Sequence, residues 1–242
     1  MQVSFNLSRN KVYALILTLS ILVSLFIGIQ VGTATTANAP WTLNAPPTSA
    51  YNAYVGQYAN GTYFYEKGDW QTWYNSNNAS QVINFAIGNL TASRTVPETI
   101  FVQGTFNFTS PIIVPSYTTI KIDGKWYKSF SGSLIQNSNR TGCNEGISFI
   151  GIGDAPIIYG NSATYTGKGF DFVNSAGTIS GSGGNVGVTI ENLKIIEFNG
   201  DAFHMNNSGI AGSDFLRMHD TTCISVNGNG FYGEALFNSE II

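Results

Sequence analysis

The sequence predicts an all-β solenoid that follows an N-terminal export segment. From Thr95 onward the chain consists of short segments rich in Ile, Val, Phe and Thr, separated by Gly and Asn, without a helical period. Apolar–polar alternation also recurs toward the C-terminus at steps of 21 to 25 residues. Repeats of this length indicate stacked coils. A β-sandwich or open barrel is the alternative, which the in-phase recurrence of Asn disfavours because hairpin proteins do not need it.

The composition excludes two broad classes of protein. Only 10% of the 242 residues are charged, and 13% are aromatic, with a net charge of -3. A disordered chain has few aromatics and a high net charge, so we expect a folded domain. The 11 Lys and Arg residues are scattered and form no basic stripe. We therefore expect no nucleic-acid partner.

Residues 1–39 form the export segment. Basic residues precede an uninterrupted apolar run at 12–29, and small residues follow it. The run is longer than a usual cleaved signal and just long enough to span a bilayer. Residues 37–39 (Ala-Asn-Ala) fit a cleavage site, but Pro40 hinders cleavage. Signal peptide and retained membrane anchor both stay open, and we expect a secreted or cell-surface protein that meets a membrane only through this segment.

The rest of the chain divides into three parts. Residues 40–50 are Pro-rich and read as a linker. Residues 51–94 contain an aromatic hairpin with tight turns, then a helix that Asn78 or Ser80 caps and that runs through Leu90. Residues 95–242 form the solenoid.

Two registers suggest how the last coils stack. Ile190–Asn192, Phe215–Arg217 and Leu236–Asn238 can be superimposed, which places Arg217 at an Asn position. Phe203–Asn206 superimposes on Ile224–Asn227 at a step of 21. Period-two alternation then puts Phe203 and Met205 inside with Ile224 and Val226 stacked on them, His204 outside above Ser225, and Asn206 in an amide ladder with Asn227.

The chain stops within the third of these coils. Ile241 and Ile242 are apolar, and no polar cap follows them. A solenoid needs such a cap to cover its last strands and core. We therefore expect the solenoid to be incomplete at the C-terminus or to associate end to end with another chain.

Residues 80–128, 147–160 and 186–242 resemble the successive coils of the pectate-lyase-like (pectin lyase-like) superfamily. The resemblance is carried by Phe101–Phe106 (FVQGTF), Pro111–Gly124 (PIIVPSYTTIKIDG) and Ile147–Gly160 (ISFIGIGDAPIIYG). The aromatic lead-in at 51–74 is similar to uncharacterised archaeal surface β-helix proteins. The resemblance implies a right-handed parallel β-helix with an N-terminal capping helix. It does not select an activity, because the superfamily contains lyases, hydrolases, epimerases, phage tailspikes and non-catalytic adhesins.

The catalytic signatures of that superfamily are absent, which leaves only weak candidates. Paired acids with a GHG and an RxK motif, as in polygalacturonase-like hydrolases, do not occur. No cofactor is expected, and Ca²⁺ enters only if the protein is a lyase. Asp201 begins its strand and fits a turn residue better than a catalytic one, and His204 fits a solvated histidine on the sheet face better than a general base. The candidate catalytic residues, which form a cluster with His219, are Asp201, His204, Arg217 and Asp220.

Aromatic and modified residues give further candidates. Sugars stack on exposed indole rings, although packing in the cap explains the same residues; the candidates are Trp70, Trp73 and Trp126. Export makes a disulfide between Cys143 and Cys223 one option and a buried thiol the other. Glycosylation sequons begin at Asn60, Asn78, Asn89, Asn107, Asn139 and Asn206.

The sequence thus predicts an exported cell-surface β-helix protein that binds polysaccharide or serves as an adhesive or envelope module. The alternative is a carbohydrate-active enzyme, either a polysaccharide lyase or a glycoside hydrolase, that acts on acidic glycans. An enzyme should show a cluster of carboxylates beside a groove on one outer face.

Overall fold

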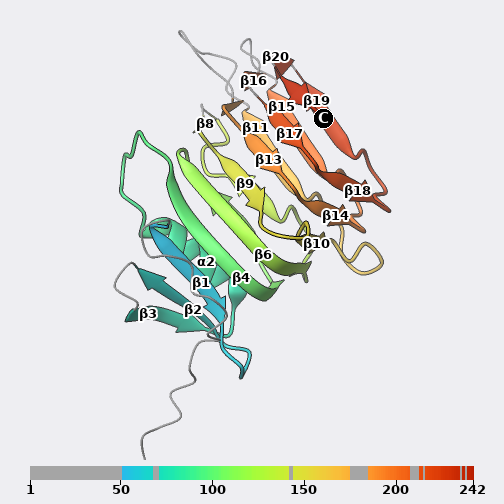
Figure 1. Ribbon diagram of the computed structural model, residues 1–242. Coiled ribbons are helices and arrows are strands. Elements are labelled where there is room, and N and C mark those ends of the chain that lie inside the picture. The colour runs from blue at the N-terminus through green and yellow to red at the C-terminus, as the bar shows by residue number, and fades with distance from the viewer. Residues whose placement is uncertain are drawn as a thin grey trace, which may run out of the picture. The chain divides into compact units, whose positions relative to one another are not determined.

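The computed structural model describes residues 51–67, 71–141, 144–174, 185–207, 213–214, 216–234, 236–237 and 239–242. These residues form many strands and one helix, so the fold is all-β as predicted (Figure 1). Residues 1–39 and 40–50, which we predicted to be an export segment and a linker, lie outside this set. Among the residues in these ranges, no helix has the length and apolar character that crossing a bilayer requires.

The predicted aromatic hairpin is confirmed and is extended by a third strand. β1 (Ala53–Gln57), β2 (Tyr63–Lys67) and β3 (Gln71–Ser76) pair antiparallel in sequence order. Gly61 has φ 87° in the first turn, a backbone conformation that glycine adopts without strain. β1 also pairs in parallel with β4 (Glu98–Phe108), so the hairpin is continuous with the parallel sheet that follows.

The predicted helix is α2 (Ala79–Gly88). Asn78 is its N-cap, and the side-chain Oδ1 accepts a hydrogen bond from Gln81 N at 3.3 Å. Val82 and Ile83 are fully buried against the strands beneath. Ser80 Oγ donates to the carbonyl of Ser110 at 2.8 Å, which fixes the helix on the turn that follows β4.

The two longest strands run side by side and bend together. β4 pairs in parallel over its whole length with β6 (Thr118–Lys128). At the bend, Gly104 and Gly124 have φ 126° and 138°, and a Cβ on Gly124 would lie 2.0 Å from Gly104 O. No other residue fits there. Tyr117, which has φ 56°, separates β5 (Ile112–Val114) from β6.

A set of three short strands then recurs along the chain. The first set is β9 (Ser148–Gly151), β10 (Ile157–Tyr159) and β11 (Phe170–Asn174). The second is β13 (Thr189–Glu191), β14 (Lys194–Ile196) and β15 (Phe203–Asn207), and the third is β17 (Arg217–His219), β18 (Thr222–Ile224) and β19 (Phe231–Glu234). The remaining strands are β7 (Ile135–Asn137), β8 (Asn144–Glu145), β12 (Asn185–Val186), β16 (Ser213–Asp214), β20 (Leu236–Phe237) and β21 (Glu240–Ile241).

Each strand pairs in parallel with its counterpart in the next set. The orders are β4-β6-β9-β13-β17-β21, β6-β10-β14-β18 and β5-β7-β11-β15-β19. Figure 1 shows β9, β13 and β17 as neighbouring arrows in this stack. Parallel pairing requires the chain to return to the same end of the sheet before each new strand, and here the other two strands of the set make that return.

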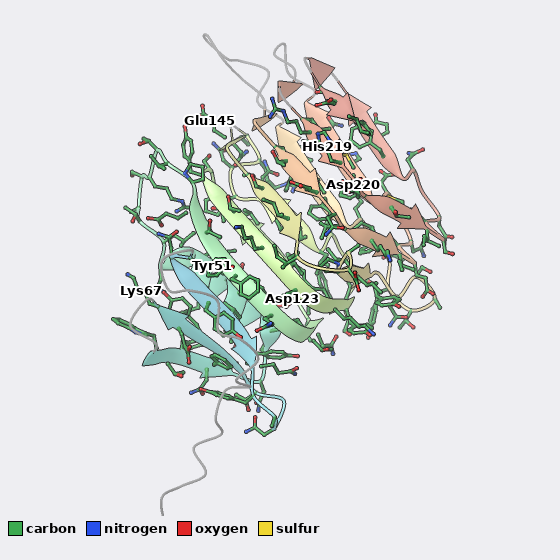
Figure 2. All side chains as sticks on the ribbon, viewed as in Figure 1. Tyr51, Lys67, Asp123, Glu145, His219 and Asp220 are labelled. Atoms are coloured by element: carbon green, nitrogen blue, oxygen red, sulfur yellow. The ribbon has the colours of Figure 1, made fainter. Side chains whose placement is uncertain are left out.

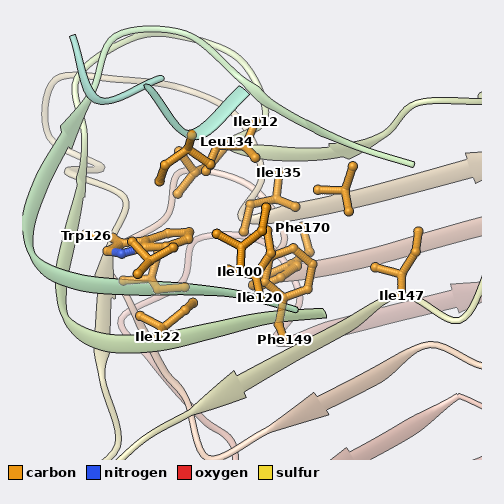
Figure 3. Close-up of a cluster of buried hydrophobic side chains, with 14 of the residues drawn as sticks. Ile100, Ile112, Ile120, Ile122, Trp126, Leu134, Ile135, Ile147, Phe149 and Phe170 are labelled. Atoms are coloured by element: carbon orange, nitrogen blue, oxygen red, sulfur yellow. The ribbon is translucent and has the colours of Figure 1, made fainter. Parts of the chain in front are cut away.

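The core consists of side chains that point inward from these ladders (Figure 3). Alternation along each short strand sends every second residue inside, and equivalent positions in successive strands stack. Ile120, Phe149 and Ile190 form one such stack, since each pairs with the next. All three are at most 1% exposed. The predicted inward orientation of Phe203 and Met205 is confirmed, because they are 0% and 2% exposed.

The predicted registers of the last coils are wrong. Ile190 pairs with Met218, 28 positions later, rather than with Phe215. Phe203 pairs with Phe231, also 28 positions later, while Ile224 pairs with Ile196 and is 45% exposed. The 21-residue step matched strands that belong to different ladders. Alternation has a period of two in every ladder, so the pattern alone did not separate them.

The predicted amide ladder between Asn206 and Asn227 is also wrong. Asn206 pairs with Glu234, and Asn227 N donates to Phe198 O at 2.9 Å. Another asparagine makes the bridge between coils. Asn137 Nδ2 donates to the carbonyl of Val173 at 2.8 Å, and Val173 N donates back to Asn137 Oδ1 at 3.0 Å. Paired donors and acceptors of this kind satisfy a buried amide that is 1% exposed.

Candidate functional site

Three residues at equivalent positions form a row on the outer face of β11, β15 and β19. Asp171 pairs with His204, and His204 pairs with Tyr232. Phe170 and Phe172 flank Asp171 on β11 and point inward, so alternation along the strand directs Asp171 outward. We call Asp171, His204 and Tyr232, together with Arg140 and Lys168, the Asp171 row.

Asp171 is an outward-facing carboxylate that is nevertheless only 6% exposed. Arg140 Nη2 lies 2.8 Å from Oδ2 and Lys168 Nζ lies 3.0 Å from Oδ1. Arg140 Nη1 also donates to the backbone carbonyl of Asp171 at 3.1 Å. Burial opposes ionisation of this carboxyl, but hydrogen bonds and charge from Arg140 and Lys168 outweigh it and hold the pKa of Asp171 below its ordinary value.

The His204 imidazole lies against this carboxylate. Nδ1 is 2.9 Å from Asp171 Oδ1, which is an ion-pair distance when the ring is protonated, but the angles are not those of a hydrogen bond. The ring stacks on Tyr232 with centroids 4.9 Å apart and planes 9° apart. The side chain is 12% exposed. The prediction of a solvated histidine above Ser225 is therefore wrong, because coils of 28 residues place Tyr232 there.

The Asp171 row has more positive than negative groups. Arg140 and Lys168 carry two positive charges beside one carboxylate, and their side chains are 37% and 30% exposed. Cationic side chains that reach solvent at such a site can bind a carboxylate, sulfate or phosphate group of a ligand. Within the part of the chain that the structure describes, no three His, Cys, Asp or Glu side chains gather into a possible metal site.

The other candidate catalytic residues lie apart from this row. Asp201 Oδ1 accepts hydrogen bonds from Asn229 N and Nδ2 at 2.8 and 3.0 Å, so it fixes a turn of the next coil. Arg217 is exposed on β17 and pairs with Thr189. The predicted alignment of Arg217 with Asn192 is therefore wrong. Asp220 follows β17 with φ 50°. This corner conformation favours Asp and Asn, which gives Asp220 a structural role.

His219 lies on β17, one residue before Asp220, and both are labelled in Figure 2. Its Nε2 is 3.5 Å from Glu240 Oε2 on the neighbouring β21. β17 belongs to a different ladder from β15, which carries His204. The five residues expected to cluster therefore come from two ladders and from turns. Comparisons find no matching family model, curated protein or solved structure.

The three tryptophan candidates differ in accessibility. Trp126 is 0% exposed in the core, so it cannot stack on a sugar, and that prediction is wrong. It packs beside Phe108, with ring centroids 5.0 Å apart. Trp73 on β3 is 56% exposed and stays a candidate. Trp70 lies outside the described residues.

The predicted modification sites also differ in accessibility. Asn60, Asn89, Asn107 and Asn139 are exposed, whereas Asn78 and Asn206 are partly buried. Asn206 Oδ1 is buried and has no hydrogen-bond partner among the residues that the structure describes. Cys223 is a free thiol on β18, and its proposed partner Cys143 lies outside the described residues.

Sequence reasoning did not find Asp171, Arg140 or Lys168. The signal was present in Phe170-Asp171-Phe172, where a carboxylate stands between two core aromatics. An acid in such a strand must either be solvated or have cationic partners. Arg140 is 31 positions away, so only the correct register brings it to Asp171.

Proposed function

We propose that this chain is a right-handed parallel β-helix that acts at the cell surface by binding acidic polysaccharide. The three parallel ladders and the recurrence of three strands per coil support the β-helix. Parallel strands joined by crossovers are nearly always right-handed, which supports the handedness. The apolar run at 12–29 supports export, either as a signal peptide or as an anchor.

The observation that carries the proposed ligand class is the excess of cationic groups in the Asp171 row. The chain as a whole has a net charge of -3, so a partly exposed pair of cations fixed on one carboxylate is a local exception. The carboxylates of a polyuronate, or the sulfates of a sulfated glycan, complement such a row. A linear glycan that lies along the stacked strands would also place its successive sugar units against successive coils.

A second candidate function is favoured by one feature of the same row. A carboxylate that holds one nitrogen of an imidazole leaves the other nitrogen for proton transfer, as in many general bases. Asp171 Oδ1 lies 2.9 Å from His204 Nδ1, a contact without the angles of a hydrogen bond, and the other ring nitrogen is left for proton transfer. If the protein is an enzyme, we therefore assign the base to His204 and the positioning role to Asp171.

Binding of the full chain to polygalacturonate, alginate and uncharged dextran tests the proposal. We expect added salt to weaken retardation by the acidic polymers, whereas any retardation by dextran should not depend on salt. Lys168→Gln should weaken retardation severalfold, while Lys194→Gln, which removes a partly exposed lysine from β14, should not. Retardation by the acidic polymers that added salt leaves unchanged would contradict the proposed ligand class. Ultraviolet absorbance of unsaturated products in the same mixtures would instead establish the enzyme, provided that His204→Gln abolishes it.

A further inference from the structure

A hollow of ≈ 660 Å³ opens on the outer side of β1, β4 and β6, where the long strands bend. Tyr54 and Phe64 form one wall, and Asp123 and Lys125 form the opposite side. A second hollow of ≈ 330 Å³ continues across Asp123 and Lys125 toward Asp154. We call the two hollows together the bend groove. It lies on different ladders from the Asp171 row.

A chain of hydrogen bonds crosses three adjacent strands in this groove. Tyr54 Oη donates to Gln103 Oε1 at 3.0 Å, and Gln103 Nε2 donates to Asp123 Oδ2 at 2.8 Å. Asp123 is labelled on β6 in Figure 2. Burial, then the charges of Glu66 and Asp123, raise the pKa of Tyr54 to about 12, so its phenol stays a donor at all ordinary pH values. The orientation of the Gln103 amide is therefore fixed.

This chain of hydrogen bonds leaves one donor of Gln103 and one acceptor of Asp123 unused among the described residues. The second N–H of Gln103 and the Oδ1 atom of Asp123 make no hydrogen bond to any residue that the structure describes. Adjacent hydroxyl groups of a sugar present the complementary pair, because each hydroxyl both donates and accepts. Such a pair, held before the ligand arrives, lowers the entropic cost of binding.

The walls and floor of the groove suit a flat ring. The bend at Gly104 and Gly124 provides a floor without side chains, so a ligand can approach the backbone. Tyr54 and Phe64 lie beside it with ring centroids 5.7 Å apart. Ligand sites typically combine such apolar walls with a few fixed polar groups.

The charges of the groove argue against a polyanion. Asp123 and Asp154 oppose the single ammonium of Lys125, which leaves an excess of negative charge. We propose that the bend groove binds a neutral, hydroxyl-rich saccharide, as a site separate from the acidic-glycan site of the Asp171 row. A sugar ring packs against Tyr54, and two of its hydroxyls bind Gln103 and Asp123.

Calorimetric titration of the full chain with cellotetraose, maltotetraose, mannotetraose and triacetylchitotriose tests this site. We expect at least one to bind, with an affinity that added salt does not reduce. Gln103→Leu should lower the affinity by about tenfold, the usual effect of losing one buried hydrogen-bonding partner. Gln81→Leu, on the exposed side of α2, is the matched control.

A second variant, Thr105→Trp, keeps the proposal testable if Gln103→Leu does not fold. Thr105 is exposed at the rim, so Thr105→Trp blocks the groove without changing the core. Binding that persists in both Thr105→Trp and Gln103→Leu, or no binding by any of the four sugars, overturns the proposal. The two sites are measured with different ligands, neutral oligosaccharides at the bend groove and acidic polymers at the Asp171 row, so a failure at one is distinguishable from a failure at the other.

Discussion

Lys128 permits a quantitative test of the core. Its side chain is 0% exposed, and Nζ donates to Thr166 O at 2.7 Å. The rings of Phe130 and Tyr165 lie 5.2 and 5.9 Å from Nζ. Burial lowers the pKa of Lys128 from 10.5 to about 8. The folded state therefore releases this proton more readily than the unfolded state.

The sign of the pH dependence follows directly. Between pH 8 and pH 10.5 the unfolded chain keeps a proton on Lys128 that the folded chain has lost, so the free energy of unfolding rises with pH in this window. A difference of about 2.5 pKa units corresponds to ~3 kcal/mol. Solvent relaxation around the ammonium reduces the expected gain to about 1 to 2 kcal/mol by pH 10.

Urea unfolding of the wild type and of Lys128→Met, followed by tryptophan fluorescence from pH 7 to pH 10, measures this gain. Methionine has a similar length and no charge, so other titrating groups cancel in the difference. We expect the wild type to gain stability relative to the variant as pH rises. Lys125→Met removes one exposed ammonium and is the matched control. Parallel curves for the wild type and Lys128→Met would refute a buried lysine with a lowered pKa.

Three further predictions concern the core, the Asp171 row and the last strand. Met205→Asp should destabilise the fold by several kcal/mol because it buries an unpaired carboxylate. Thr222→Asp introduces the same carboxylate at an exposed position and should have little effect, and thermal unfolding of the two variants measures the difference. Asp171→Asn should remove stability that the wild type has above pH 4 and loses as the pH falls through the lowered pKa of Asp171. Acid titrations of the two proteins monitored by circular dichroism should therefore converge once the pH lies below that lowered pKa, and a constant gap would contradict this. Ile241 and Ile242 are 55% and 73% exposed, so their replacement by Lys should reduce any concentration-dependent association seen by light scattering, and unchanged association would place the contact elsewhere.

Local signals in the sequence were sufficient for individual elements. An Asn before an amphipathic segment predicted the cap of α2, and alternation predicted that Met205 points inward. Both depend on neighbours along the chain, where spacing is fixed by backbone geometry. Trp126 was predicted incorrectly because aromatic residues suit a core and a sugar platform equally well, and only its position in β6 decides between them.

The site depended on distances that the sequence does not contain. Arg140 meets Asp171 only after the coil length between them is known, and that length changes from coil to coil. Gln103 and Asp123 adjoin for the same reason, since they are partners in the pairing of β4 with β6. A repeat with a constant period would have revealed these pairs, but the variable loops concealed them.

The unequal coils have a consequence for how this surface can change. Ile120 to Phe149 spans 29 positions, Phe149 to Ile190 spans 41, and Ile190 to Met218 spans 28, yet all four residues stack in one ladder. Insertions between strands therefore need not disturb the pairing, because backbone hydrogen bonds and inward side chains determine the register. New loops could be grafted at the same corners of a coil, and each would alter the outer face while the stack beneath it kept its order.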